Sequence, residues 1–130
     1  MLNFAIPQGS AGGNSVLSMY HTVSFSTIYY SVTNPAASAS ESPAVLTWVA
    51  AACAATTLSV FSQQANTITV TLRNGTAGSL ANTALACVAT TNGSCAVTGS
   101  VAVAAGSFLD LSIVGANGSP GGVWTAVGCS

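Results

Sequence analysis

The sequence predicts an all-β protein that folds as one antiparallel β-sandwich domain. Apolar and polar residues alternate with a period of two through much of the 130-residue chain, which is the pattern of strands that bury one face. Asn-Gly pairs and segments containing Gly or Pro separate these runs, as turns do between short strands. No segment sustains a helical period of about 3.6 residues. A chain of this length is sufficient for one domain with one core.

The first predicted strand follows a short arm. Residues 1–15 contain the glycine-rich segment Gly9–Gly13 and are expected to form an N-terminal arm, which leaves 16–130 for the sandwich. The phase of the alternation switches at Ile28, so we expect a bulge or a strand break near Thr27. Before the switch, one phase holds Leu17, Met19, His21, Val23 and Phe25.

The clearest strand covers Thr67–Arg73. Its apolar phase is predicted to face the core, and its threonines and Arg73 to face solvent. Leu109, Leu111 and Ile113 repeat the pattern, which places Asp110 and Ser112 outside. Shorter strands are predicted at Val45–Val49, Leu58–Phe61, Ala84–Val88, Val101–Val103 and Val123–Val127.

Three Asn-Gly pairs predict tight turns, because both residues tolerate positive φ. They are Asn74-Gly75, Asn92-Gly93 and Asn117-Gly118, and each also begins a glycosylation sequon that a turn explains better. Asn34 to Pro43 is expected to form a longer polar loop. About eight short strands at such intervals favour a sandwich of the jelly-roll type.

Charge is almost absent from the sequence. Glu41, Arg73 and Asp110 are its only charged side chains, there is no lysine, and the formal net charge is −1. One arginine cannot neutralise a row of phosphates, so the composition argues against nucleic-acid binding. Near-neutral surfaces associate readily, which favours a subunit that contacts its own copies or a scaffold. With so few titratable groups, stability is expected to change little between about pH 5 and pH 9.

Four cysteines stand at positions 53, 87, 95 and 129. Their spacing gives little support to a four-thiolate zinc site, and no cofactor is expected. Cys87 and Cys95 flank a polar loop and are predicted to face each other across a hairpin with Val88 opposite Ser94. Cys53 and Cys129 would then tie an early strand to the last. Four cysteines allow three connectivities, so other pairings and four buried free thiols stay open.

The segment from Ala52 to Val127 carries a resemblance to known domains. The run Ala-Ala-Cys53-Ala-Ala-Thr-Thr-Leu-Ser-Val leads to Thr-Ile-Thr-Val-Thr-Leu-Arg73, and Ser100-Val-Ala-Val-Ala-Ala-Gly106-Ser-Phe-Leu follows later. This order resembles the small jelly-roll domains, similar to C1q and tumour-necrosis-factor heads, of phage structural proteins and bacterial surface proteins. Ser107 stands where those domains often have an acid. The resemblance implies homotrimers or fibre heads and no catalytic residues to carry over.

Two sets of side chains are candidates for a site. His21 is the one group that titrates near neutral pH, but its place on the apolar phase predicts a buried histidine with a satisfied hydrogen bond. A catalytic triad would need Glu41 or Asp110 beside it, and no spacing indicates this, so we do not expect an enzyme. An aromatic platform for sugar is the second candidate, although packing is the default for these rings. Its rings would be Tyr20, Tyr29, Tyr30, Trp48 and Trp124, with amides from Gln63, Gln64 and Asn66.

The function that these patterns favour is structural assembly. We expect a virion surface component, such as a capsid decoration or cement protein, that packs apolar β-faces against its own copies and a major capsid or other scaffold protein. The N-terminus lacks a signal-peptide pattern, which favours assembly at the site of synthesis unless a signal was removed. No segment is apolar enough to predict a membrane span. The alternatives are a subunit of an extracellular filament and a carbohydrate-binding fibre-head module, with a surface glycan as partner.

Overall fold

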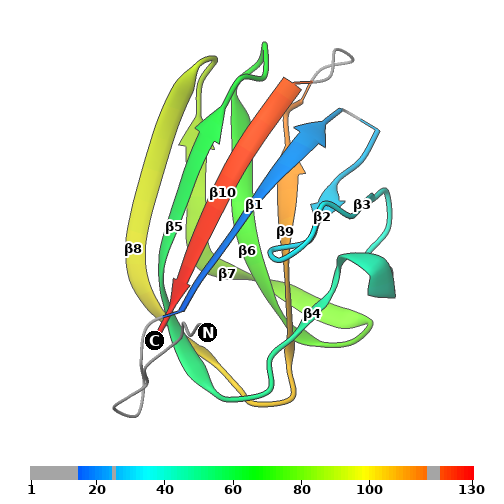
Figure 1. The fold of residues 1–130 in the computed structure, drawn as a ribbon, viewed down its shortest axis with the longest axis vertical. Helices are drawn as coiled ribbons and strands as arrows, with labels where there is room; N and C mark the ends of the chain where they lie inside the picture. Colours follow the sequence, from blue (N-terminus) through cyan, green and yellow to red (C-terminus); the bar gives the residue numbers. More distant parts are fainter. Residues whose placement is uncertain (1–14, 25, 117–120) are drawn as a thin grey trace, which may run out of the picture.

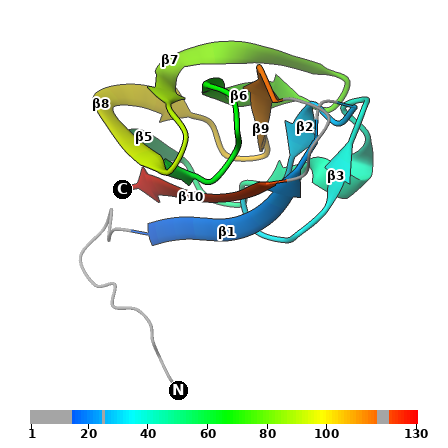
Figure 2. The ribbon, with the colours of Figure 1, turned by 90° about the horizontal axis from the view of Figure 1, so that it is seen from above.

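Two antiparallel sheets pack face to face around one core. The computed structural model describes residues 15–24, 26–116 and 121–130, and Figures 1 and 2 show the two layers. Sheet A has the order β1 (Ser15–Val23), β10 (Gly121–Cys129), β5 (Cys53–Ser62) and β8 (Gly93–Val103). Sheet B has the order β3 (Ala37–Ser38), β2 (Tyr29–Tyr30), β9 (Phe108–Val114), β6 (Ile68–Thr76) and β7 (Ser79–Ala89), and β4 (Thr47–Trp48) also pairs with β9. The predicted all-β sandwich is therefore confirmed.

The strands pair in a nested order. β1 pairs with β10, β2 with β9, β5 with β8, and β6 with β7, all antiparallel. These four pairs lie alternately in sheet A and sheet B. The described chain is thus arranged like one long antiparallel hairpin that reverses between β6 and β7. This hairpin is wound so that successive strand pairs belong to opposite sheets. This winding brings the first and last strands side by side (Figure 1).

The core is formed by the apolar phases that the sequence predicts. Leu109, Leu111 and Ile113 on β9 are at most 2% exposed. The inward residues of β6 are fully buried as well, as are Leu58 on β5 and Val123 and Val127 on β10. Burial of each such side chain contributes about 1.5–3 kcal/mol. The apolar phase of β1 also faces inward through Val23, while Phe25 lies outside the described residues.

Some predicted elements differ in the structure. The segment predicted as a strand at Val45–Val49 begins instead as a 3₁₀ turn, η1 (Pro43–Val45), and continues as the two-residue β4. Pro43 opens this turn, and its carbonyl accepts a hydrogen bond from the Leu46 N–H at 3.2 Å. The other short predictions fall inside longer strands, because Ala, Ser and Thr continue the alternation without a strong apolar signal.

The Asn-Gly prediction holds at one of the two described pairs. Asn92 has φ 53°, and the Gly93 N–H donates to the Thr90 carbonyl at 2.9 Å, which closes a turn. Asn74-Gly75 lies within β6, so the predicted turn there is wrong; the chain reverses at residues 77–78. The pair at 117–118 lies outside the described residues, as do residues 1–14 of the predicted arm.

The outer side of β9 is buried, contrary to the sequence prediction. Asp110 is 0% exposed and Ser112 is 8% exposed. The segment between β1 and β5 brings Glu41 against this side of sheet B, where it meets Arg73 on β6. Residues that alternate outward on β9 are therefore covered by a part of the chain that the strand pattern alone does not place.

Candidate functional sites

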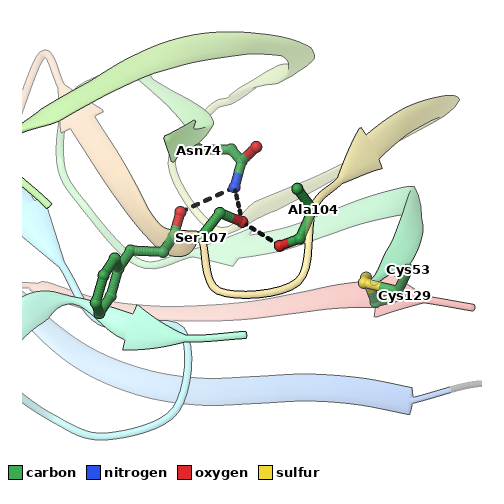
Figure 3. Close-up of a disulfide and its surroundings, with 6 residues drawn as sticks. Cys53, Asn74, Ala104, Ser107 and Cys129 are labelled. Atoms are coloured by element: carbon green, nitrogen blue, oxygen red, sulfur yellow. Dashed lines mark hydrogen bonds between the residues drawn. A yellow bond between two sulfur atoms is a disulfide. The ribbon is translucent and has the colours of Figure 1, made fainter. Parts of the chain in front are cut away.

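Two disulfides hold the sandwich together. Cys53 is bonded to Cys129 and Cys87 to Cys95, with Cα–Cα distances of 5.6 and 6.0 Å, and no cysteine is free. These are the pairs that the sequence favours. The first bridge joins β5 to β10 within sheet A, near the C-terminal end of β10 (Figure 3). It fixes β10 covalently to its neighbour β5.

The second bridge crosses between the sheets. Cys87 lies on β7 of sheet B, and Cys95 lies on β8 of sheet A. The predicted hairpin register is therefore wrong, because Val88 pairs with Thr69 on β6 and Ser94 pairs with Phe61 on β5. The bridge closes one side of the sandwich, where a short connection takes the chain from one layer to the other.

A serine closes the connection between β8 and β9 (Figure 3). The Ser107 hydroxyl donates to the Ala104 carbonyl at 2.6 Å and accepts from the Asn74 side-chain amide at 3.0 Å. The same Asn74 amide donates to the Phe108 carbonyl at 2.9 Å. The neutral Ser107 hydroxyl thus links the turn before β9 to β6.

All three charged side chains of the protein meet at one place on sheet B. The Arg73 guanidinium donates to both Glu41 carboxylate oxygens, at 2.8 and 3.1 Å, and also to the Asn82 side chain and the Leu80 carbonyl. Its Nε lies 3.9 Å from the Asp110 carboxyl. Charged residues are scattered in the sequence, so this charged cluster of Glu41, Arg73 and Asp110 could not be read from spacing. We find no unpaired charged side chain at the surface, since Arg73 and Glu41 are only 17% and 16% exposed.

Asp110 is the buried acid of the charged cluster. Burial, and after it the neighbouring Glu41 carboxylate, raise the pKa of Asp110 to about 9, although Arg73 acts in the opposite direction. Neither of its carboxyl oxygens has a hydrogen-bond partner among the described residues. Hydrogen bonding with Arg73 lowers the pKa of Glu41. At neutral pH the charged cluster therefore holds one carboxylate, one guanidinium and one neutral acid.

His21 is a core residue. It is 2% exposed, its Nε2 hydrogen-bonds to the Ser31 carbonyl at 2.8 Å, and its ring meets the Tyr30 ring edge-on at 5.1 Å between centroids. Burial lowers its pKa. Within the described residues, no hydrogen bond or ion pair joins His21 to Glu41 or Asp110. His21 thus ties β1 of sheet A to the segment after β2, and the acids needed for a triad pair elsewhere.

Three aromatic rings stand in a row on the outer face of sheet A. Tyr20 on β1 pairs with Trp124 on β10, which pairs with Phe61 on β5. The ring centroids of Tyr20 and Trp124 are 4.7 Å apart, and those of Trp124 and Phe61 are 5.6 Å apart. The three residues are 45%, 41% and 39% exposed. We call them the aromatic row.

A shallow hollow of about 700 Å³ adjoins the aromatic row. Its floor is the next cross-strand row, in which Ser18, Ala126, Ser59 and Ala96 succeed one another from β1 to β8. Ser94, which follows Phe61 in the aromatic register, borders it as well. Small side chains next to large ones produce the depression.

The other predicted platform residues lie elsewhere. Tyr30 is fully buried, Tyr29 packs under the Arg73 guanidinium at 5.6 Å, and Trp48 is 62% exposed on β4. Gln64 is fully buried, and its side-chain amide donates to the Val23 carbonyl. Gln63, in contrast, reaches the aromatic row: a β-carbon added to Gly122 would meet both Tyr20 and Gln63 Oε1, the latter at 3.3 Å. Asn66 is exposed, in the connection between β5 and β6.

Sequence reasoning missed Phe61 as a platform residue. The signal was present, because Leu58 and Val60 alternate with Ser59 and Phe61, and only the first two face the core. Tyr20 and Trp124 are among the predicted platform residues, but the sequence does not show that they lie beside Phe61, because they stand on β1 and β10.

Comparisons with known proteins identify no relative. No family model, no curated protein and no solved structure matches the chain. In the described part of the chain, no helix is long and apolar enough to cross a membrane, and no group of three or more His, Cys, Asp or Glu side chains is placed to hold a metal ion.

Proposed function

We propose that this chain is a structural assembly protein, a jelly-roll subunit that decorates or cements the surface of a virion. The observation that carries the proposal is the charged cluster. Because Arg73 and Glu41 pair with each other and are largely buried, and Asp110 is fully buried, the exposed side chains of both outer sheet faces are neutral. Such faces approach another protein without the cost of desolvating or opposing charges.

The strand order supports the jelly-roll assignment. Jelly rolls are two-sheet sandwiches built from Greek keys, and a rolled hairpin with nested antiparallel pairs has this connectivity. The four pairs β1–β10, β2–β9, β5–β8 and β6–β7 alternate between the sheets as such a hairpin requires. The short strands β3 and β4 are then additions to an eight-stranded plan.

The assembly surface that fits best is the outer face of sheet B. Val88, Thr69 and Val114 form one cross-strand row there, and the two valines are 56% and 59% exposed. Ala86 lies in the adjacent row and is exposed too. An exposed patch of β-branched and small residues suits close packing against a copy of the chain or a capsid protein. The resemblance to jelly-roll heads makes a trimer the first expectation for the assembly.

Sedimentation velocity of the purified protein at micromolar concentration tests self-association. We expect a trimer, and we expect Val88→Lys to shift it toward monomer while leaving the far-UV circular dichroism unchanged. Ala77→Lys, in the exposed turn between β6 and β7, is the matched control and should leave the trimer intact. A strictly monomeric wild-type protein, or equal effects of the two lysines, would contradict the assembly surface.

A separate experiment tests whether the protein lies on a virion. Antibody against the purified chain, viewed by electron microscopy on material from the native source, should label virion surfaces. Label along extracellular filaments would replace the virion proposal with the filament subunit. The two disulfides are compatible with a virion surface and with an extracellular filament, because each of these locations is outside the reducing cytosol.

A further inference from the structure

We propose that the aromatic row and its hollow form a binding site for a neutral oligosaccharide. The site lies on the outer face of sheet A, opposite the assembly surface on sheet B. It goes beyond the proposed function, because a subunit attached through sheet B would present this face outward. The ligand is a single soluble glycan chain that lies across β1, β10 and β5.

The aromatic rings supply the apolar part of the site. Tyr20, Trp124 and Phe61 each leave about two-fifths of their surface open, although aromatic side chains gain most from burial. The C–H faces of a pyranose ring are apolar and pack on aromatic faces, while its hydroxyls point outward. Three rings at spacings of 4.7 and 5.6 Å offer successive contacts to successive sugar units.

Polar groups border the rings on both sides. On one side lie the exposed residues Ser18 and Ser59, and Ser94 stands next to Phe61 at the end of the row. On the other side lies Gln63, whose Oε1 reaches the same space above β10 as the Tyr20 hydroxyl. Hydroxyls and an amide donate and accept hydrogen bonds, which is what sugar hydroxyls require. Binding sites commonly combine an aromatic surface with a few polar groups of this kind.

The arrangement of the aromatic row depends on a glycine. A β-carbon at Gly122 would lie 2.7 Å from Tyr20 Cε1, so a larger residue would push the Tyr20 ring away from β10. Gly122 therefore allows Tyr20 to lie over β10 beside Trp124, with Gln63 next to it. The absence of a side chain at this position organises both the rings and the amide.

Charge restricts the ligand to neutral sugars. Recognition of a carboxylate or sulfate group normally uses Arg or Lys. The one arginine is committed to Glu41 on sheet B, and the lining of the hollow contains no ionisable group other than the Tyr20 phenol. Uronic-acid and sulfated chains would thus lose hydration without gaining an ion pair.

The tilt of the aromatic rings restricts the physical form of the glycan that can bind. Tyr20 and Trp124 are inclined at 51° to each other, and Trp124 and Phe61 at 50°. The three ring planes are therefore not coplanar. A soluble chain can turn between successive units and meet rings at different inclinations, whereas the flat face of a crystalline polysaccharide cannot contact all three rings.

Isothermal titration calorimetry of the full chain tests the site. The probes are maltohexaose, cellohexaose, mannohexaose and hexa-N-acetylchitohexaose, with hexagalacturonate as the acidic comparison. We expect at least one neutral hexasaccharide to bind with a Kd of about 1 mM or tighter. Trp124→Ala should raise that Kd by about tenfold, and the matched control Trp48→Ala, on β4, should leave it unchanged.

A second variant keeps the test decisive if Trp124→Ala does not fold. Ser59→Tyr fills the hollow from an exposed position and removes no core group, so it should fold normally and abolish binding. The proposal is overturned if no neutral hexasaccharide binds, if hexagalacturonate binds more tightly, or if only crystalline polysaccharide retains the protein. It is also overturned if Trp124→Ala dissociates the oligomer, because the face would then be a protein contact. Failure of the sheet B assembly test leaves these outcomes unaffected.

Discussion

Arg73 and Glu41 are joined by two parallel hydrogen bonds, from Nε to Oε2 at 2.8 Å and from Nη2 to Oε1 at 3.1 Å. The pair connects β6 of sheet B to the segment between β3 and η1. That segment contains no helix or strand, and this ion pair links it to sheet B. It also places a carboxylate next to the buried Asp110.

Glu41→Gln is therefore expected to destabilise the fold. The substitution keeps the shape of the side chain but removes its charge, and hydrogen bonds to charged groups contribute about 1.5–3 kcal/mol. We expect the free energy of unfolding to fall by about 2 kcal/mol in urea denaturation at pH 7. Ser42→Ala, at the adjacent position, is the control and should change it by less than about 0.5 kcal/mol. An equal loss in both variants would mean that the segment, and not the ion pair, determines the effect.

Stability is expected to decrease as the pH rises from 6 to 9. The pKa of Asp110 is about 9 in the folded protein, against an ordinary value of 3.8, so the folded state binds this proton more tightly. The resulting stabilisation is complete below the unfolded pKa and is lost as the pH rises through the folded pKa. We expect the melting temperature to fall by at least about 4 °C between pH 6 and pH 9, or roughly 1 kcal/mol.

Asp110→Asn tests the origin of this decrease. Asparagine keeps the shape of the neutral acid and cannot ionise, so its melting temperature should be nearly constant over the same range. His21 and Glu41 act in the opposite sense, because their lowered pKa values remove stability only as the pH falls. A wild-type protein with a constant melting temperature would show that Asp110 is ionised at neutral pH, as the sequence-based expectation of little pH dependence implies.

The burial of Asp110 is a feature that the sequence pattern could not predict. The alternation along β9 correctly predicts that Leu109, Leu111 and Ile113 form the core. It assigns Asp110 to solvent, because period two describes the two faces of a strand and not what later covers them. Glu41 reaches that face through a loop, and no local pattern encodes where a loop packs.

The aromatic row was hidden for a related reason. Tyr20 and Trp124 lie on strands at opposite ends of the chain, and they become neighbours only through the pairing of β1 with β10.

The position of the Cys87–Cys95 bridge also depends on how the strands pair. A spacing of eight residues fits a hairpin within one sheet and a crossing between two sheets, and only the partners of β7 and β8 decide between them.

The two disulfides should contribute unequally to stability. Cys53 and Cys129 are 76 residues apart, whereas Cys87 and Cys95 are 8 apart. In the chain-entropy model, these loops correspond to about 4.5 and about 2.5 kcal/mol. We expect the Cys53→Ala/Cys129→Ala double variant to lose more stability in urea than Cys87→Ala/Cys95→Ala. The reverse order would indicate that holding the two sheets together matters more than shortening the unfolded chain.

The final prediction concerns the Asn74 side chain. Its amide nitrogen donates to the Ser107 hydroxyl and the Phe108 carbonyl, at 3.0 and 2.9 Å (Figure 3). Asn74→Asp replaces both donors by an acceptor and places a negative charge against the Phe108 carbonyl oxygen. We expect a loss of about 2–3 kcal/mol in urea at pH 7. Because protonation of the new carboxylate restores one donor, the loss in Asn74→Asp should shrink as the pH approaches 4. Asn74→Ala has no titratable group, so its loss relative to the wild-type protein should be the same at every pH. Equal behaviour of the two variants at all pH values would show that the amide donors do not hold the connection between β8 and β9.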